Sequence, residues 1–305
     1  MLFRNLTLFR FVPDPGLAAA LETALPAHRL KPVAPLTMAS RGWVSPYGRD
    51  SDVLSHALGN SRLLALGGED RLLPPAVVNE AVALKVAALA ADRGRPPGAR
   101  DRKRLREDVL HDLMPRAFVR PSRLAGYLDL DRGWLAIDSA SRKTAEGFVA
   151  ALRETLGSFA AVPLDAGESP RASMTAWLRD GNLPKLWQLG EECELKDPVD
   201  RGAVVKCRRQ ELAADEVRAH LKSGKQATML EFAFDDHVVF VLDELLVLRK
   251  LRFLDTVTAE LESADRDSVA TEIDARFAVM SLTLAPLFEA LEVVFKLAAA
   301  DARKT

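Results

Sequence analysis

The order of apolar and polar residues predicts a chain in which strands and helices are mixed. A nearly continuous apolar run at residues 2–11 is typical of a buried strand. Asp14 is then predicted to begin a helix, because Leu17 and Leu21 fall on one face at helical spacing. The chain therefore opens with a strand followed by a helix.

Further segments of both kinds follow without a regular strand–helix–strand rhythm. A turn is predicted at 131–133, and Ser141 and Gly157 have the chemistry of a helix N-cap and a helix stop. The later predicted strands are 62–66, 124–130, 134–138, 203–208, 226–234, 238–242 and 246–253. The later predicted helices cover 78–89, 105–113, 141–156, 215–222 and most of the last fifty residues. The predicted class is α+β with mixed antiparallel sheets, and residues 170–199 receive no assignment.

Three regions are predicted from these elements, since the length of 305 residues suggests about two domains. Residues 1–75 and 119–175 are predicted to form an N-terminal α+β domain. Residues 76–118 are predicted to form a protruding pair of antiparallel helices, joined by a loop rich in Gly, Pro and Arg. Residues 176–305 are predicted to form a C-terminal α+β domain that ends in helices.

Composition narrows the class of protein. The chain is 48% hydrophobic and 28% charged, as is ordinary for a soluble globular protein. Its two cysteines, Cys193 and Cys207, lack CxxC or metal-binding spacing, which favours a reducing cytoplasm. No apolar run approaches the roughly 18–20 residues that span a bilayer, and no signal-peptide pattern precedes the first strand. We therefore expect a cytoplasmic protein without a membrane partner.

Charge is balanced overall but segregated along the chain. The 42 Lys and Arg residues against 43 Asp and Glu residues give a formal net charge of −1. Residues 93–123 carry ten basic and four acidic residues, and 201–225 carry seven basic and three acidic ones. The stretch 255–305 has ten acidic and five basic residues. The net charge near zero excludes a protein whose whole surface is basic. It still allows one basic surface that binds nucleic acid.

One group of basic residues lies on a predicted strand. Side chains alternate along a strand, so Lys206 and Arg208 are expected to share a face with Gln210. Arg209 is expected to point the other way unless the strand ends or bulges there. Basic groups held on an ordered strand lose little entropy when they bind phosphates, which makes this segment a candidate nucleic-acid site.

A second basic group, Arg249, Lys250 and Arg252, lies on the predicted strand 246–253, and Lys225 precedes another strand. The alternative is that these residues only protect edge strands from aggregation. For residues 100–106, a solvated helix face with local ion pairs is an equally good interpretation, and residues 93–98 could equally form a flexible tip.

Catalytic motifs are absent from the sequence. It has no GxGxxG, GxxxxGK[ST], GxSxG or HExxH, and its five histidines stand singly. The best catalytic candidate is Asp235-Asp236 beside His237, with Asp129 and Asp131, because two-metal phosphodiester hydrolysis needs clustered carboxylates. Aspartate is also favoured in turns between strands, which is the simpler explanation for these positions.

Several blocks of sequence, taken together, resemble the RdgC family of bacterial recombination-associated nucleoid proteins. The resemblance extends over essentially the whole chain, although Ser45 and the loop at 93–100 depart from the family pattern. The blocks are FRNL at 3–6, GWV at 42–44, HDLMPRAF at 111–118, LGS at 156–158 with VPL at 162–164, and RRQEL at 208–212.

The resemblance implies a ring-shaped homodimer that binds DNA without sequence preference and encircles double-stranded DNA, with single-stranded DNA as a possible second ligand. It implies a protein of the nucleoid that limits RecA-promoted recombination indirectly, by occupying DNA. It implies no catalysis, cofactor or metal, although the family carries an exonuclease label. The residues expected to contact DNA are Lys206, Arg208, Arg209, Gln210, Lys225, Arg249, Lys250 and Arg252.

The dimer interface is expected to include Phe118 and Arg116. From the residues alone, Phe118 could instead be a core anchor beneath the end of a helix; the resemblance favours an aromatic side chain that inserts into the partner subunit. Two other functions remain open. One is a metal-dependent DNA exonuclease, and the other is direct contact with the recombinase through the acidic C-terminal helices.

Overall fold

Two compact units make up the chain. The computed structural model describes residues 2–199, 202–263 and 268–300. The first unit comprises Met1–Leu25, Ser45–Ala65 and Leu124–Thr305, and the second comprises Pro26–Val44 and Leu66–Arg123. Two antiparallel sheets are combined with helices, which confirms the predicted α+β class.

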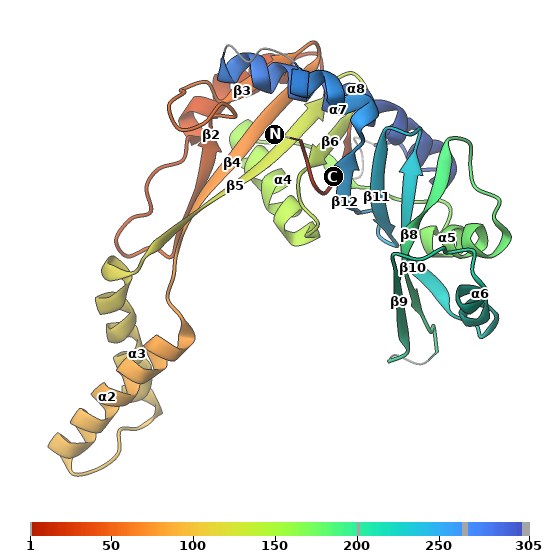
Figure 1. Ribbon diagram of the computed structural model, residues 1–305. Helices are drawn as coiled ribbons and strands as arrows, with labels where there is room; N and C mark the ends of the chain where they lie inside the picture. The colour runs from red at the N-terminus through yellow and green to blue at the C-terminus, as the bar shows by residue number, and fades with distance from the viewer. Residues whose placement is uncertain (1, 200–201, 264–267, 301–305) are drawn as a thin grey trace. The chain divides into compact units, whose positions relative to one another are not determined.

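A five-stranded antiparallel sheet lies entirely in the first unit (Figure 1). Its strands are β8 (Trp187–Lys196), β9 (Val204–Arg208), β10 (Gln226–Phe234), β11 (Val238–Asp243) and β12 (Leu248–Phe253), in the order β12-β11-β10-β8-β9. Along β10 the side chains alternate, so Leu230 and Phe232 are buried while Glu231 between them is partly exposed. One face of this sheet therefore covers the core and the other carries polar residues.

The N-terminal segment covers the outer edge of β12. The backbone of Leu6 exchanges hydrogen bonds with Leu248 at 2.7 and 2.9 Å, and Leu251 N–H donates to the Arg4 carbonyl at 2.7 Å. This pairing satisfies an edge that would otherwise be open to other chains. It also brings Arg4 next to the basic residues of β12.

The other sheet has the order β2-β4-β5-β6-β1-β7, with β3 also paired to β4. Its strands are β1 (Thr7–Phe11), β2 (Ala39–Val44), β3 (Ser55–Leu58), β4 (Ser61–Arg71), β5 (Val119–Asp129), β6 (Trp134–Ile137) and β7 (Ala161–Pro163). The predicted end of a strand at residue 66 is wrong, because β4 continues through Gly67 and Gly68. A Cβ on Gly67 would lie 2.5 Å from a Val44 methyl carbon, so the glycine allows close strand packing there.

Helices accompany the strands in both units. They are α1 (Leu17–Ala24), α2 (Pro75–Arg93), α3 (Ala99–Leu113), α4 (Arg142–Leu156), α5 (Pro170–Asp180), α6 (Asp215–Lys222), α7 (Asp255–Ser263) and α8 (Val269–Phe295), with short 3₁₀ turns at Leu25–His28 and Met114–Arg116. The predicted ends of α4 are confirmed: Ser141 accepts a hydrogen bond from Thr144 N–H at 3.3 Å, and Gly157 has φ +76°.

Aromatic residues concentrate in the core of the first unit. Trp187 on β8 packs edge-to-face against Phe232 and Phe240, with ring centroids 5.0 and 5.7 Å apart. By length and composition α8 could also cross a bilayer. Its buried side chains instead join this core; they are Phe277, Met280, Leu284, Leu287, Phe288, Leu291 and Phe295.

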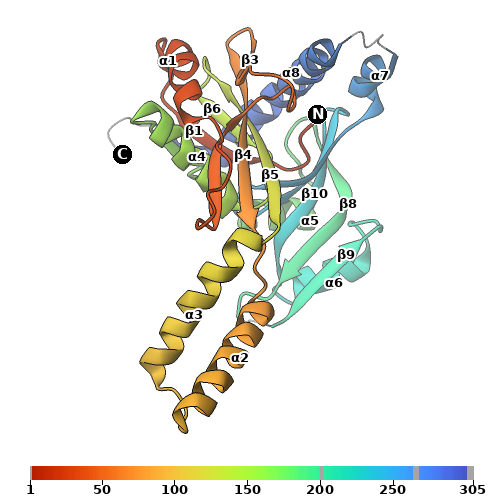
Figure 2. The ribbon, with the colours of Figure 1, turned by 90° about the vertical axis from the view of Figure 1, so that its left-hand side faces the viewer.

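The second unit contains α2 and α3, which lie side by side and are joined by residues 94–98 (Figure 2). Each helix buries one valine, Val78 and Val109. Polar contacts add to this small apolar interface, including an ion pair of 2.7 Å between Lys85 and Asp112. Most of the remaining surface of the two helices is exposed.

Candidate nucleic-acid interface

A depression of about 640 Å³ lies on the polar side of the five-stranded sheet. Its lining comes from β8, β9, β10, β12 and the N-terminal segment, and it is richer in basic than in acidic side chains. The lining residues are Arg4, Glu191, Glu192, Arg208, Arg209, Glu231, Lys250, Leu251 and Arg252. Four of these were predicted to contact DNA from two separate segments of the sequence, and the fold brings them together.

Strand alternation explains which β9 side chains reach this surface. Cys207 is buried, whereas its neighbours Lys206 and Arg208 are exposed. The strand ends at Arg208, and Arg209 adopts the left-handed region with φ +54°. Arg209 consequently lines the same depression as Arg208. Gln210 is exposed beyond the end of the strand.

A bulge in β12 determines how its basic residues are presented. The pairing of β12 with β11 shifts between Arg252 and Arg249, and Lys250 lies at this irregularity with φ +53°. Lys250 and Arg252 are exposed and Leu251 is buried. Both cations therefore project from the polar side of the sheet.

Cations and carboxylates form two layers on this surface. The charged ends of the outer layer belong to side chains that are 54–66% exposed, namely Lys206, Arg208, Lys250 and Arg252. The inner layer consists of side chains that are only 13–21% exposed, namely Glu192, Glu194 and Glu231. In each of these ion pairs the cation is thus more exposed than its carboxylate, although the exposed carboxylate of Glu191 also lines the depression.

Each carboxylate of the inner layer faces a cation of the outer layer. Lys206 lies 2.8 Å from Glu194, and Arg252 lies 3.4 Å from Glu231. Lys206 also holds the pKa of Glu194 below its usual range, chiefly through its hydrogen bond to the carboxylate. Sequence reasoning missed these supporting acids, because it considered the basic segments without their strand partners.

Two further arginines, Arg4 and Arg209, line the depression. Within the part of the chain that the structure describes, the side chains of Arg4 and Arg209 have no ion-pair partner. Both are exposed. Arg4 was not singled out from the sequence, and only its place in the FRNL block pointed to it.

The other two predicted contacts, Arg249 and Lys225, are engaged elsewhere. Arg249 donates to the buried carboxylate of Asp243 at 2.9 Å, and that carboxylate also accepts the N–H groups of Leu245 and Val247. Lys225 lies just before β10 with a side chain that is only 15% exposed, and its ammonium is 4.0 Å from Asp197. Arg201, counted in the basic stretch 201–225, lies outside the described residues.

The two cysteines lie beneath the basic surface. Cys193 on β8 and Cys207 on β9 are directly opposite each other, and both are buried free thiols. Burial, followed by the proximity of Cys207, raises the pKa of Cys193 to about 12. The pair therefore packs as small apolar side chains in its reduced form.

Phe118 lies in the second unit, between the turn at Met114–Arg116 and β5. Its side chain is 84% exposed, so the alternative that it anchors the core is wrong. Arg116 and Val119 beside it are exposed as well. A large aromatic side chain at such exposure is a candidate for contact with another chain.

The carboxylates considered for metal binding belong to different turns. Asp235 and Asp236 form the β10–β11 turn, both with φ +53°, and Gln188 donates to Asp236 at 3.1 Å. Asp129 accepts backbone hydrogen bonds in the β5–β6 turn, and Asp131 there accepts from Asn60. Among the described residues, no group of three or more His, Cys, Asp or Glu is placed to hold a metal ion.

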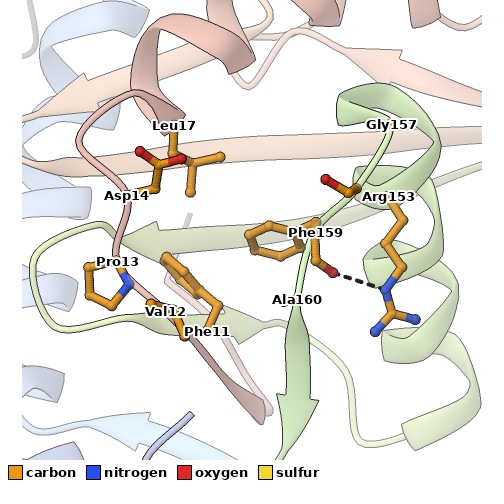
Figure 3. Close-up of a pocket in the computed structure, with 10 residues that line it drawn as sticks. Phe11, Val12, Pro13, Asp14, Leu17, Arg153, Gly157, Phe159 and Ala160 are labelled. Carbon is orange, nitrogen blue, oxygen red and sulfur yellow. Dashed lines mark hydrogen bonds between the residues drawn. The ribbon is translucent and has the colours of Figure 1, made fainter. Parts of the chain in front are cut away.

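A larger cavity, of about 840 Å³, lies elsewhere in the first unit (Figure 3). Phe11, Pro13 and Phe159 contribute apolar surface to it. Arg153 is the basic residue of its lining, and this guanidinium donates to the carbonyls of Phe159 and Ala161 at 3.0 and 2.8 Å. These bonds give Arg153 a structural role at the end of α4.

The fold and surface define an α+β protein with a basic layer over one sheet face. A family model described as "Putative exonuclease, RdgC" matches residues 1–298. The chain belongs to the RdgC family.

Relatives named recombination-associated protein RdgC match it along nearly its whole length. Those of Xanthomonas campestris pv. campestris (strain B100) and Xanthomonas axonopodis pv. citri (strain 306) are each 50% identical, over 303 and 302 residues. That of Stenotrophomonas maltophilia (strain R551-3) is 48% identical over 302 residues. Each comparison covers 99% of this chain and 100% of the relative.

Proposed function

We propose that this protein binds DNA without sequence preference and that two copies form a ring around double-stranded DNA. The observation that carries the proposal is the layered charge on the five-stranded sheet, where exposed cations lie over less exposed carboxylates. Phosphates approaching from solvent meet the cations first, and such contacts give affinity without reading sequence.

The proposed DNA contacts centre on Arg208, Arg209, Lys250 and Arg252, which line one depression. Lys206 and Gln210 extend the surface along and beyond β9. Lys225 and Arg249 have a supporting role, since their ion pairs help to position the surrounding segments. An ordered sheet presents these groups with little loss of side-chain entropy on binding.

Closure of the ring is proposed to involve Phe118 and Arg116 of the second unit, which follow the C-terminal end of α3 where the α2–α3 pair joins β4 and β5. A buried aromatic residue surrounded by polar neighbours is typical of the residues that dominate interface energetics. The exposure of Phe118 in the single chain is consistent with this role.

The names of the relatives associate the family with recombination. We propose that this chain limits RecA-promoted recombination in the nucleoid by occupying DNA that the recombinase would use. Inhibition would then be lost when the DNA is saturated with recombinase beforehand. Inhibition that persists under those conditions would instead favour direct contact between the two proteins.

Equilibrium binding to two duplexes of unrelated sequence tests the DNA-binding proposal. Counterion release predicts similar affinities for both, and a loss of about 100-fold or more between about 50 and 200 mM salt. A dissociation constant that does not change with salt would contradict the proposal. Degradation of the duplex with Mg²⁺ or Mn²⁺ that Asp235→Asn abolishes would favour the exonuclease alternative.

A further inference from the structure

One carboxylate on the basic surface contacts two cations from different strands. Lys250 on β12 donates to Glu192 Oε1 at 2.7 Å and also contacts Oε2, while Arg208 Nε on β9 lies 3.4 Å from Oε1. Glu192 itself belongs to β8. It therefore links the two basic segments that the sequence places about forty residues apart.

Solvent reaches the three side chains unequally. Arg208 and Lys250 are 64% and 54% exposed, whereas Glu192 is 21% exposed. A phosphate arriving from solvent can contact both cations on their open side, while the carboxylate holds them from below. Phosphate and Glu192 would then compete for the same donors.

Glu192 is held less firmly than the other two carboxylates of the inner layer. Glu194 accepts a further hydrogen bond from Thr228 at 3.0 Å, and Glu231 accepts one from the Glu191 backbone N–H at 2.8 Å. Within the described part of the chain, Glu192 has only its two cations as side-chain partners. Once they turn to a phosphate, its carboxylate is free to reorient toward water.

We propose that Glu192 is an internal competitor for DNA phosphates, which holds Arg208 and Lys250 in the free protein and must be displaced for DNA to bind. The inference rests on the proposed DNA-binding function and adds a contact that limits the affinity for DNA. Exposed ion pairs are weak enough to exchange for a phosphate contact. The competition lowers affinity, and it keeps a non-specific binder from being held too tightly at any one position.

The test compares Glu192→Gln with Glu191→Gln in the full-length protein. Both variants remove one negative charge from the same depression, but only Glu192 contacts cations, since the side chain of Glu191 has no ion-pair partner in the described chain. Glutamine keeps the size of the side chain and an oxygen that can accept hydrogen bonds. Thermal unfolding of both variants checks that each is folded.

The proposal predicts that Glu192→Gln binds a duplex of fixed sequence roughly three- to tenfold more tightly than Glu191→Gln, at the same low salt concentration. Equal affinities would overturn it, since the charge alone would then explain any gain. Weaker binding by Glu192→Gln would also overturn it and would mean that the carboxylate mainly positions the cations. If the wild-type protein does not bind DNA, the proposed function itself fails, which is a separate result.

Discussion

The guanidinium of Arg71 donates to the carbonyl of Met114 at 2.6 Å. Met114 begins the short turn that leads to Phe118, and Leu72 N–H donates to the Phe118 carbonyl at 2.8 Å. Other nitrogens of the same guanidinium donate to the carbonyls of Thr37 and Ala34. Arg71 therefore positions the backbone that presents the proposed interface residue.

Replacing Arg71 by methionine should weaken dimer formation roughly tenfold, because several carbonyls lose a charged donor and the segment before Phe118 is no longer held. Sedimentation equilibrium measures the dissociation constant. Lys85→Met is the matched control, since it removes a cation whose partner is the exposed Asp112 side chain on α3. Equal effects of the two variants would refute a positioning role for Arg71.

Phe118→Ala should weaken dimer formation and leave the stability of the single chain nearly unchanged. Because the side chain is 84% exposed, its removal should change the free energy of unfolding of the single chain by less than about 0.5 kcal/mol. If it inserts into the partner, the dimer should be weakened by about 2 kcal/mol, or roughly 30-fold. Leu282→Ala, at 73% exposure on α8, serves as the control. A dimer of unchanged strength would remove Phe118 from the interface.

Arg209→Ala should mainly reduce DNA affinity, whereas Arg249→Ala should mainly reduce the stability of the fold. Arg209 is exposed and without an ion-pair partner among the described residues, so its loss should lower DNA affinity and reduce the salt slope by about 1 while leaving stability unchanged. Arg249→Ala should cost about 1–3 kcal/mol of unfolding free energy, since it leaves the buried Asp243 carboxylate without its cation.

Binding isotherms and denaturant titrations of both variants measure these two effects. Arg249→Ala should reduce DNA affinity less than Arg209→Ala does. The reverse order would mean that Arg249 leaves Asp243 to contact phosphate.

The raised pKa of the Cys193 thiol predicts that the protein loses stability at alkaline pH. Its pKa of about 12 in the folded chain exceeds the value of about 8.5 expected when unfolded. The unfolded chain therefore releases the proton first, and stability that is present below about pH 8.5 falls as pH rises, by at most about 1.4 kcal/mol per pH unit.

Urea titrations between about pH 7.5 and 9.5 measure this slope. Cys193→Ala should flatten it, whatever the variant does to stability at neutral pH. An identical slope in both proteins would show that Cys193 ionises normally in the folded chain.

Local chemistry was enough to predict several elements. Ser141 and Gly157 define the ends of α4, because capping and left-handed backbone depend on single residues. Alternation likewise predicted β10 and the exposed side of β9. The sequence did not reveal α5 and β8, which occupy residues left without assignment, nor the continuation of β4 through two glycines.

The parts of the candidate site that the sequence did not predict depend on contacts between distant segments. Lys250 and Glu192 are 58 residues apart, and Arg4 reaches β12 through backbone pairing at the sheet edge. The exposure of Phe118 also depends on tertiary packing, since an aromatic residue next to a helix end is as easily buried. Such relationships follow from the order of strands in the sheet, which periodicity alone does not determine.

Encirclement is tested most directly by topological trapping on one plasmid in closed circular and linearised form. The protein is bound to both at low salt and then challenged with high salt, which removes contacts that depend on phosphate charge. A closed ring should remain on the circular plasmid and slide off the ends of the linear one. Equal loss from both forms would contradict encirclement and would favour ordinary surface binding.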